Sequence, residues 1–238
     1  MRQLFQARSV LVALALGLLS CAAASAAPIT LIFTGTLSVV DAVLSPTFSL
    51  GQAWSMTMVF DSATPPFFDN GVVAQYAGSS ASANVTAGAY VATIDPLAAG
   101  KPGSLSVQNG DNVFGDALSV SALALVGAKV GGKMPGWASV FLFDLPGTAI
   151  SDLSLPTSID LTKFSSGGIF SIEFGDICNY DPGPNNNFPT AGCNFPASVG
   201  GTVDSVTVNA GGSIPEPGTL VLLGLGILGI GASRRRTA

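Results

Sequence analysis

Apolar and polar residues alternate with a period of two along much of this chain. In the clearest run, residues 53–60, every second residue is large and apolar: Trp54, Met56, Met58 and Phe60. Successive side chains of a β-strand point to opposite faces, so this run predicts a half-buried strand. Residues 168–174 repeat the pattern and predict a second strand of the same kind.

Further strands are expected wherever short apolar runs end in Gly, Pro, Asn or Asp. They are residues 29–40, 72–76, 82–86, 89–94, 104–107, 113–114, 137–143, 158–161 and 202–208. Asn109-Gly110-Asp111 is a hairpin signal. Residues 117–126 fit either a strand or a short helix, because serines alternate with apolar residues but alanine and leucine are frequent. Ten or more short strands separated by turns indicate an antiparallel fold.

Composition supports the same fold class. Between residues 27 and 213 the chain has one Glu, four Lys and no Arg, so strong helix formers are scarce. Large apolar residues are frequent enough to exclude a disordered chain. We therefore predict one all-β domain over residues 27–209, an antiparallel β-sandwich of jelly-roll type. A signal helix would precede it and a short transmembrane helix would follow it.

The first 26 residues have the three parts of a secretory signal peptide. Arg2 and Arg8 supply positive charge, residues 10–19 are apolar, and Ala24-Ser25-Ala26 is a cleavage site. We predict a cut between Ala26 and Ala27 and export through the Sec pathway. Cys21 leaves an alternative open, because the residues before it loosely resemble the lipidation signal of bacterial lipoproteins.

The C-terminus has a second three-part pattern behind a Gly-rich linker, residues 210–214. Pro215-Glu216-Pro217 interrupts helix formation, an apolar helix is possible over residues 219–232, and Arg234, Arg235 and Arg236 follow. The apolar run from residue 220 to 232 would be about 20 Å long as a helix, against about 30 Å for a bilayer core. Such a segment spans a membrane only marginally, which favours temporary retention over permanent anchoring.

Charge and chemistry exclude several classes of function. All five arginines lie in the terminal segments, and residues 27–213 carry four lysines against thirteen acids, a formal charge of −9. Such a domain is a poor nucleic-acid binder. The chain has no histidine, which excludes Ser-His-Asp and Cys-His catalysis and His-ligated zinc. We predict no catalytic residues, no cofactor and no metal.

Cys178 and Cys193 are the cysteines that remain after signal removal. An even pair in an exported protein predicts a disulfide, here closing a loop of about fifteen residues and stabilising it by about 3 kcal/mol. Asp176 and Asp181 lie in or beside this loop near three asparagines, so calcium binding is an alternative to a solvated turn.

The sequence alone leaves two further functions possible. Trp54, Trp137 and Tyr180 could stack on sugars as part of a carbohydrate-binding module, although alternation places Trp54 in the core. Two carboxylates in a groove could hydrolyse a glycoside, with Glu173 as the single central glutamate.

The tail closely resembles the PEP-CTERM sorting signal of Gram-negative bacteria. In that family an exosortase, an integral-membrane enzyme, processes the chain near the Pro-Glu-Pro motif. The resemblance implies that residues 215–217 and 234–236 are recognition residues of a substrate. Residues 33–37 and 59–65 are also similar to segments of other proteins with this tail, which supports an all-β fold.

These features together predict an exported protein that an exosortase sorts to the cell surface or matrix. Its precursor would be held transiently in the inner membrane, and its β domain would act structurally or adhesively without catalysis. Proteins with this tail are associated with exopolysaccharide and biofilm, so exopolysaccharide is a candidate partner.

Overall fold

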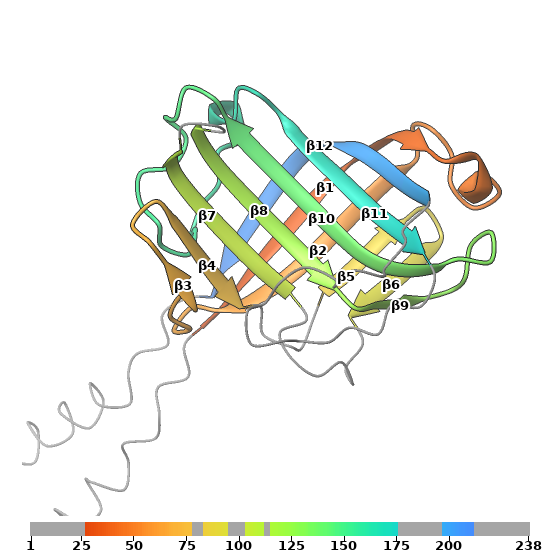
Figure 1. Ribbon diagram of the computed structural model, residues 1–238, viewed down its shortest axis with the longest axis horizontal. Helices are drawn as coiled ribbons and strands as arrows, with labels where there is room; N and C mark the ends of the chain where they lie inside the picture. The colour runs from red at the N-terminus through yellow and green to blue at the C-terminus, as the bar shows by residue number, and fades with distance from the viewer. Residues whose placement is uncertain (1–26, 78–82, 95–102, 112–114, 176–196, 212–238) are drawn as a thin grey trace, which may run out of the picture. The chain divides into compact units, whose positions relative to one another are not determined.

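Strands make up nearly all of the regular structure in the computed structural model, which describes residues 27–77, 83–94, 103–111, 115–175 and 197–211 (Figure 1). The strands are β1 (Pro28–Val40), β2 (Ala53–Asp61), β3 (Phe68–Asp69), β4 (Val73–Ala77), β5 (Ala83–Ala87), β6 (Tyr90–Ile94), β7 (Gly103–Asp111), β8 (Gly115–Leu123), β9 (Leu125–Gly127), β10 (Met134–Asp144), β11 (Gly168–Gly175) and β12 (Ala197–Ala210). Two 3-10 helices, η1 (Ala42–Leu44) and η2 (Leu161–Lys163), complete the described elements.

All twelve described strands belong to one sheet. Their order is β3-β4-β7-β8-β10-β11-β12-β1-β2-β5-β6-β9, and every described pair of neighbouring strands is antiparallel. The sheet curls over itself, so that β7, β8, β10 and β11 lie in front of β12, β1 and β2 in Figure 1. The core lies between these two layers.

The curled sheet closes into a ring at one end. Strand β9 follows β8 directly after Ala124, whose φ of 53° bends the chain. Before the bend Leu123 pairs with Trp137 of β10, and after it Leu125 pairs with Ile94 of β6. One continuous piece of chain therefore joins both sides of the sheet, while β7, β4 and β3 extend from the other edge of β8.

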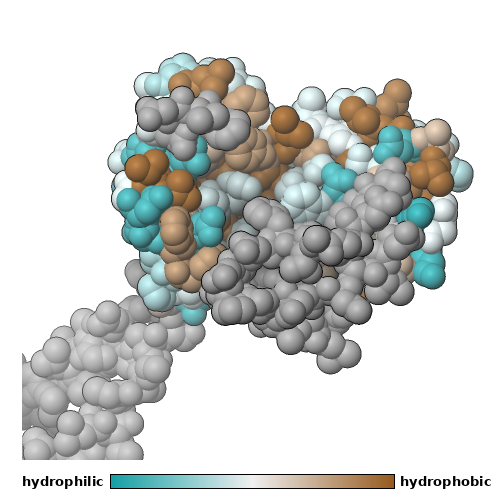
Figure 2. Space-filling view, in the orientation of Figure 1, coloured by the Kyte–Doolittle hydropathy of each residue, from teal (hydrophilic) through white to brown (hydrophobic). Residues whose placement is uncertain are grey.

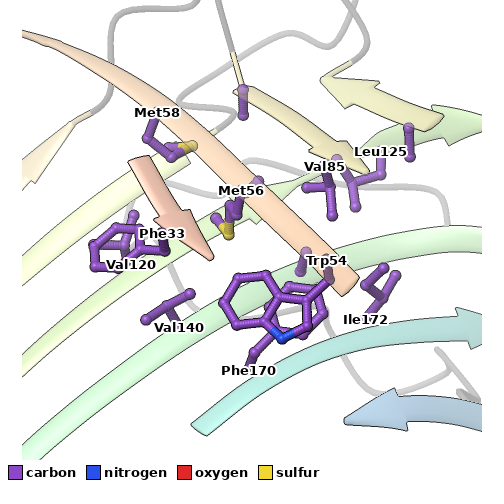
Figure 3. Close-up of a cluster of buried hydrophobic side chains, with 14 of the residues drawn as sticks. Phe33, Trp54, Met56, Met58, Val85, Val120, Leu125, Val140, Phe170 and Ile172 are labelled. Carbon is purple, nitrogen blue, oxygen red and sulfur yellow. The ribbon is translucent and has the colours of Figure 1, made fainter. Parts of the chain in front are cut away.

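The inner face of the sheet is filled with large apolar side chains. Trp54 of β2 stacks on Phe170 of β11 with ring centroids 3.7 Å apart and an angle of 6°, which joins the two layers at the centre of the core (Figure 3). The indole Nε1 donates to the Thr202 carbonyl at 3.1 Å. A Cβ at Gly35 or Gly201 would lie 2.8 Å from that nitrogen, so the ring fits because both positions are glycine.

The outer face is lined instead by small hydroxyl side chains. Ser104, Ser121, Ser139 and Ser171 lie in register across β7, β8, β10 and β11. On the other layer, Thr34 Oγ1 lies 2.7 Å from Ser205 Oγ, and Thr36 Oγ1 lies 3.4 Å from Thr202 Oγ1. At these positions short side chains that hydrogen-bond to one another make the outer face polar with little charge.

The predicted all-β, antiparallel fold class is confirmed. The structure differs from a sandwich of two separate sheets, because one continuous sheet supplies both layers. The prediction of a strand at residues 158–161 is wrong: residues 158–160 lie in a loop and Leu161 opens η2, where Asp160 accepts a hydrogen bond from Thr162 N. Residues 117–126 are strand, as their serine alternation indicated, with the bend at Ala124.

Pro28–Gly211 forms one compact unit, tied at its ends by a hydrogen bond from Gly211 N to Pro28 O. The signal helix, the transmembrane helix and the strand at residues 113–114 lie outside the described residues and stay predictions. No helix in the described ranges is both long and apolar enough to cross a bilayer.

Candidate functional site

The most elaborate loop among the described residues is the segment 145–167 between β10 and β11. Its apolar residues pack against the core, among them Ile150, Leu153, Leu155 and Ile159. The Tyr76 hydroxyl donates to the Leu153 carbonyl at 2.7 Å and fixes the middle of the loop to β4. Burial, followed by the charges of Asp69 and Asp152, raises the pKa of Tyr76, so this hydroxyl remains a donor.

Two fully buried carboxylates hold the ends of this loop. Asp116 accepts from Gly110 N at 2.9 Å and from Ile150 N at 2.6 Å, which joins the loop to the β7–β8 hairpin. Asp144 accepts from Thr148 N at 2.8 Å and from the Ser165 hydroxyl at 2.6 Å. The Ser165 hydrogen bond, followed by that of Thr148 N, lowers the pKa of Asp144, so this carboxylate stays ionised at neutral pH.

A cleft of about 300 Å³ lies between this loop and the inward-facing side of β7 and β8. Val107 and Leu118 line it together with polar residues of the loop, including Asp152, Asp160 and Lys163. Asp152 accepts from Ser154 N at 2.8 Å and Asp160 accepts from Thr162 N at 3.0 Å. Both carboxylates therefore help to shape the loop.

A second candidate lies on the outer face of β10. Trp137, Ser139, Phe141 and Phe143 occupy alternate positions of this strand and are half-buried, while Ala138, Val140 and Leu142 point into the core. The rings of Phe141 and Phe143 stack with centroids 5.6 Å apart and an angle of 28°. Ile169 of β11, the cross-strand partner of Phe141, is 55% exposed and extends the apolar surface.

Glu173 lies on the same outer face, farther along β11 and opposite Trp137. Burial raises its pKa, and the charge of Asp41 adds to the shift. Asp41 itself accepts from Ser198 N at 2.6 Å. Glu173 does not line the cleft under the 145–167 loop, so the carboxylate that the hydrolase hypothesis names is separated from this cleft.

The predicted site residues fall into three groups. Trp54 is in the core, as its alternation indicated, and Trp137 is on the outer face. Ala27 is the first described residue. The other predicted residues lie outside the described residues, so the disulfide, signal cleavage and calcium alternatives stay predictions: Cys21, Ala26, Asp176, Cys178, Tyr180, Asp181, Cys193, Pro215, Glu216, Pro217, Arg234, Arg235 and Arg236.

Sequence reasoning missed the buried pair Asp116 and Asp144. The available signal was an Asp at the start of one strand and another before Leu-Pro-Gly at the end of its neighbour. It also missed the Phe141–Phe143 platform, although the period of two across residues 137–143 already separated these rings from the core positions. Within the described residues, no cluster of three or more His, Cys, Asp or Glu side chains could hold a metal ion.

Comparison with known proteins identifies the C-terminal tail as a protein-sorting motif. Residues 213–236 match the family model of the PEP-CTERM protein-sorting motif, which confirms the resemblance of the tail. The motif implies a membrane-anchored precursor that an exosortase processes. The match does not include the β domain. Neither a curated protein nor a solved structure shows a significant match to the chain.

Proposed function

We propose that this protein is exported through the Sec pathway, cut between Ala26 and Ala27, and sorted by an exosortase to the cell surface or matrix. Its β domain acts there as a structural or adhesive module without catalysis. The observation that carries this proposal is the PEP-CTERM motif at residues 213–236. The inner membrane holds the precursor only transiently, because the apolar run is short and rich in glycine.

The described part of the β domain supports a non-catalytic role. Packed side chains fill its interior, and the carboxylates of its cleft are engaged in holding the loop. General acid–base chemistry needs a proton-transferring group that faces a space for substrate. Glu173, whose raised pKa would suit such a group, lies on the outer face instead.

The sorting step can be tested on the mature C-terminus. We expect mass spectrometry of surface protein from normal cells to find a chain that lacks Arg234, Arg235 and Arg236. Cells without the exosortase should keep these arginines on a membrane-bound precursor. Replacing Glu216 with Ala should reproduce the precursor in normal cells, whereas Gly212→Ala in the linker, just outside the matched motif, should be processed normally. Surface protein that still ends with the arginine cluster would refute the proposal.

A carbohydrate-binding module is a second candidate function. The specific observation in its favour is the aromatic pair Phe141 and Phe143 on the outer face of β10. Exopolysaccharide would then be the partner at the cell surface.

A further inference from the structure

Asn-Gly occurs twice in this chain, as Asn70-Gly71 between β3 and β4 and as Asn109-Gly110 at the end of β7. In such a pair the backbone nitrogen of the glycine can attack the side-chain amide of the asparagine, because no Cβ obstructs its approach. Asn70 and Gly71 are both exposed. Their hairpin lies at the left of Figure 1, where Figure 2 shows hydrophilic residues beside hydrophobic ones. The groups around each pair decide whether this attack is favoured.

The side-chain oxygen of Asn70 accepts two backbone hydrogen bonds. Val72 N donates to Oδ1 at 2.9 Å and Val73 N donates at 2.8 Å. Both donors are fixed to β7. Val72 O accepts from Asn109 N at 2.9 Å, and Val73 is the ladder partner of Gln108. Preorganised donors of this kind stabilise the negative charge that develops on an oxygen when its carbonyl carbon is attacked.

The attacking nitrogen is held by a carboxylate. Gly71 N donates to Asp69 Oδ1 at 2.9 Å. A carboxylate at this distance can accept the proton of the N–H group as the nitrogen bonds to the amide carbon. The φ of Gly71 is 81°, which only glycine adopts without strain. Residues 69–73 therefore bring together a nucleophile, a proton acceptor and two donors for the developing oxyanion.

Asn109-Gly110 has only part of this arrangement. Gly110 N donates to Asp116 Oδ1 at 2.9 Å, so a carboxylate is present here too. Among the contacts between described residues, however, no hydrogen bond reaches the side-chain amide of Asn109, which is half-buried. The two pairs share the nucleophile and the carboxylate and differ in the oxyanion donors. The second pair is therefore an internal control for the first.

We propose that Asn70 is a site of spontaneous deamidation, promoted by the carboxylate of Asp69 and by the two backbone donors to Oδ1. The nitrogen of Gly71 bonds to the amide carbon, the carbonyl electron pair moves to Oδ1, and Asp69 takes the proton. The bond to the amide nitrogen then breaks, and ammonia leaves with that proton, which gives a succinimide. Water opens this ring to aspartate or isoaspartate. Water is consumed, ammonia is released and nothing is oxidised or reduced.

The products change the β3–β4 hairpin. Isoaspartate adds a carbon to the main chain between residues 70 and 71. Strand β3 pairs with β4 through Phe68 with Gln75 and Asp69 with Ala74, so this short edge strand has little pairing to resist the change. Aspartate instead places a second carboxylate beside Asp69. This inference goes beyond the proposed function and depends neither on sorting nor on a ligand of the β domain.

Peptide mapping of the full-length chain, purified in detergent, tests the proposal. The folded chain is incubated at neutral pH, and samples are digested with pepsin at acidic pH, which stops the reaction. We expect mass spectrometry to find deamidation at Asn70 at least about tenfold faster than at Asn109, since a single oxyanion donor has a larger effect than this in enzymes. In urea the two rates should be similar and the rate at Asn70 lower than in the folded chain.

Either of two results would overturn the proposal. One is a folded chain in which Asn109 reacts as fast as Asn70. The other is a rate at Asn70 that is no higher in the folded chain than in urea. The mass of the mature C-terminus would still decide the sorting proposal in both cases.

A variant of Asp69 tests the proton acceptor. Asp69→Ser keeps an oxygen that can accept from Gly71 N but removes the base, so the rate at Asn70 should fall about tenfold or more. Asp61→Ser is the matched control, because Asp61 Oδ1 likewise accepts from the backbone two residues on, at Ala63 N. It should leave the rate unchanged. Each variant needs a thermal midpoint close to that of the parent. A folded Asp69→Ser chain that deamidates as fast as the parent, or faster, would overturn the role of Asp69.

Discussion

Ile169 and Phe170 are neighbours in β11, yet their side chains meet opposite surroundings. Ile169 is 55% exposed on the outer face, and Phe170 is fully buried against Trp54 on the inner one. Apolar burial stabilises a fold at about 25 cal/mol per Å², so the inner face supplies most of the stability. Side chains of the outer face bury less apolar area, so single changes there should cost less stability.

The outer face is itself uneven. On β1 and β12 the hydroxyls pair with each other, as in Thr34 with Ser205, and their hydrogen-bonding capacity is partly used. On β10 the outward positions hold aromatic rings instead. One sheet with a period of two therefore has a core filled by large apolar side chains on one side and a surface of mixed composition on the other.

The largest expected effect comes from the inner face. Phe170→Ala should lower the free energy of unfolding by about 3–5 kcal/mol, because it removes a stacked ring from a filled core and leaves a cavity. Ile169→Ala, one residue away, should change it by about 0.5 kcal/mol or less. Urea denaturation of both variants measures the contrast. Similar losses for the two would show that the faces are not energetically distinct.

The second effect concerns Asp116, one of the two fully buried carboxylates that hold the 145–167 loop. Asp116→Ala should cost about 1.5–3 kcal/mol, because Gly110 N and Ile150 N lose a charged acceptor. Asp116→Asn keeps one acceptor oxygen and should cost less. Chemical denaturation measures both, with the exposed Asp152→Ala as the control. A loss from Asp152→Ala as large as that from Asp116→Ala would contradict the anchoring role of Asp116.

The smallest effect belongs to Glu173 on the outer face. Its pKa is raised in the folded state, so the fold is favoured when Glu173 is protonated and loses that advantage as pH rises through the folded pKa. Glu173→Gln should therefore raise the thermal midpoint at pH 7 relative to the parent, by about 1 °C because solvent screens a half-exposed charge. At pH 4 the difference should be smaller. A gain of equal size at both pH values would exclude ionisation as the cause.

Much of the fold could be predicted from local pattern. The period of two in residues 53–60 and 168–174 correctly separates Met56 and Phe170 from their outward neighbours. The pattern of residues 158–161 led to a wrong prediction, because a short apolar-polar alternation also arises in a loop that packs three leucines and two isoleucines onto the core. Alternation reports which side chains are buried and does not by itself report which element carries them.

Topology and the candidate site depended on distant pairings that local pattern does not encode. Nothing in residues 115–127 shows that the chain changes partner at Ala124, from β10 to β6. Asp116 and Ile150 are separated by 34 positions in the sequence, and local pattern likewise does not reveal the hydrogen bond between them. The sorting motif was predictable because all of its parts are contiguous at the end of the chain.

Strand β12 has a consequence for the order of folding. It is the last strand of the domain, yet it pairs with β11 on one side and with β1, the first strand, on the other. Until residues 197–210 are in place, β1 and β11 each keep an open edge, and the sheet joins its two layers only through the β8–β9 bend. Pairing over such sequence distances is slow. If the chain crosses the membrane unfolded through the Sec pathway, as we propose, β1 and β11 gain their shared partner only after residues 197–210 have crossed.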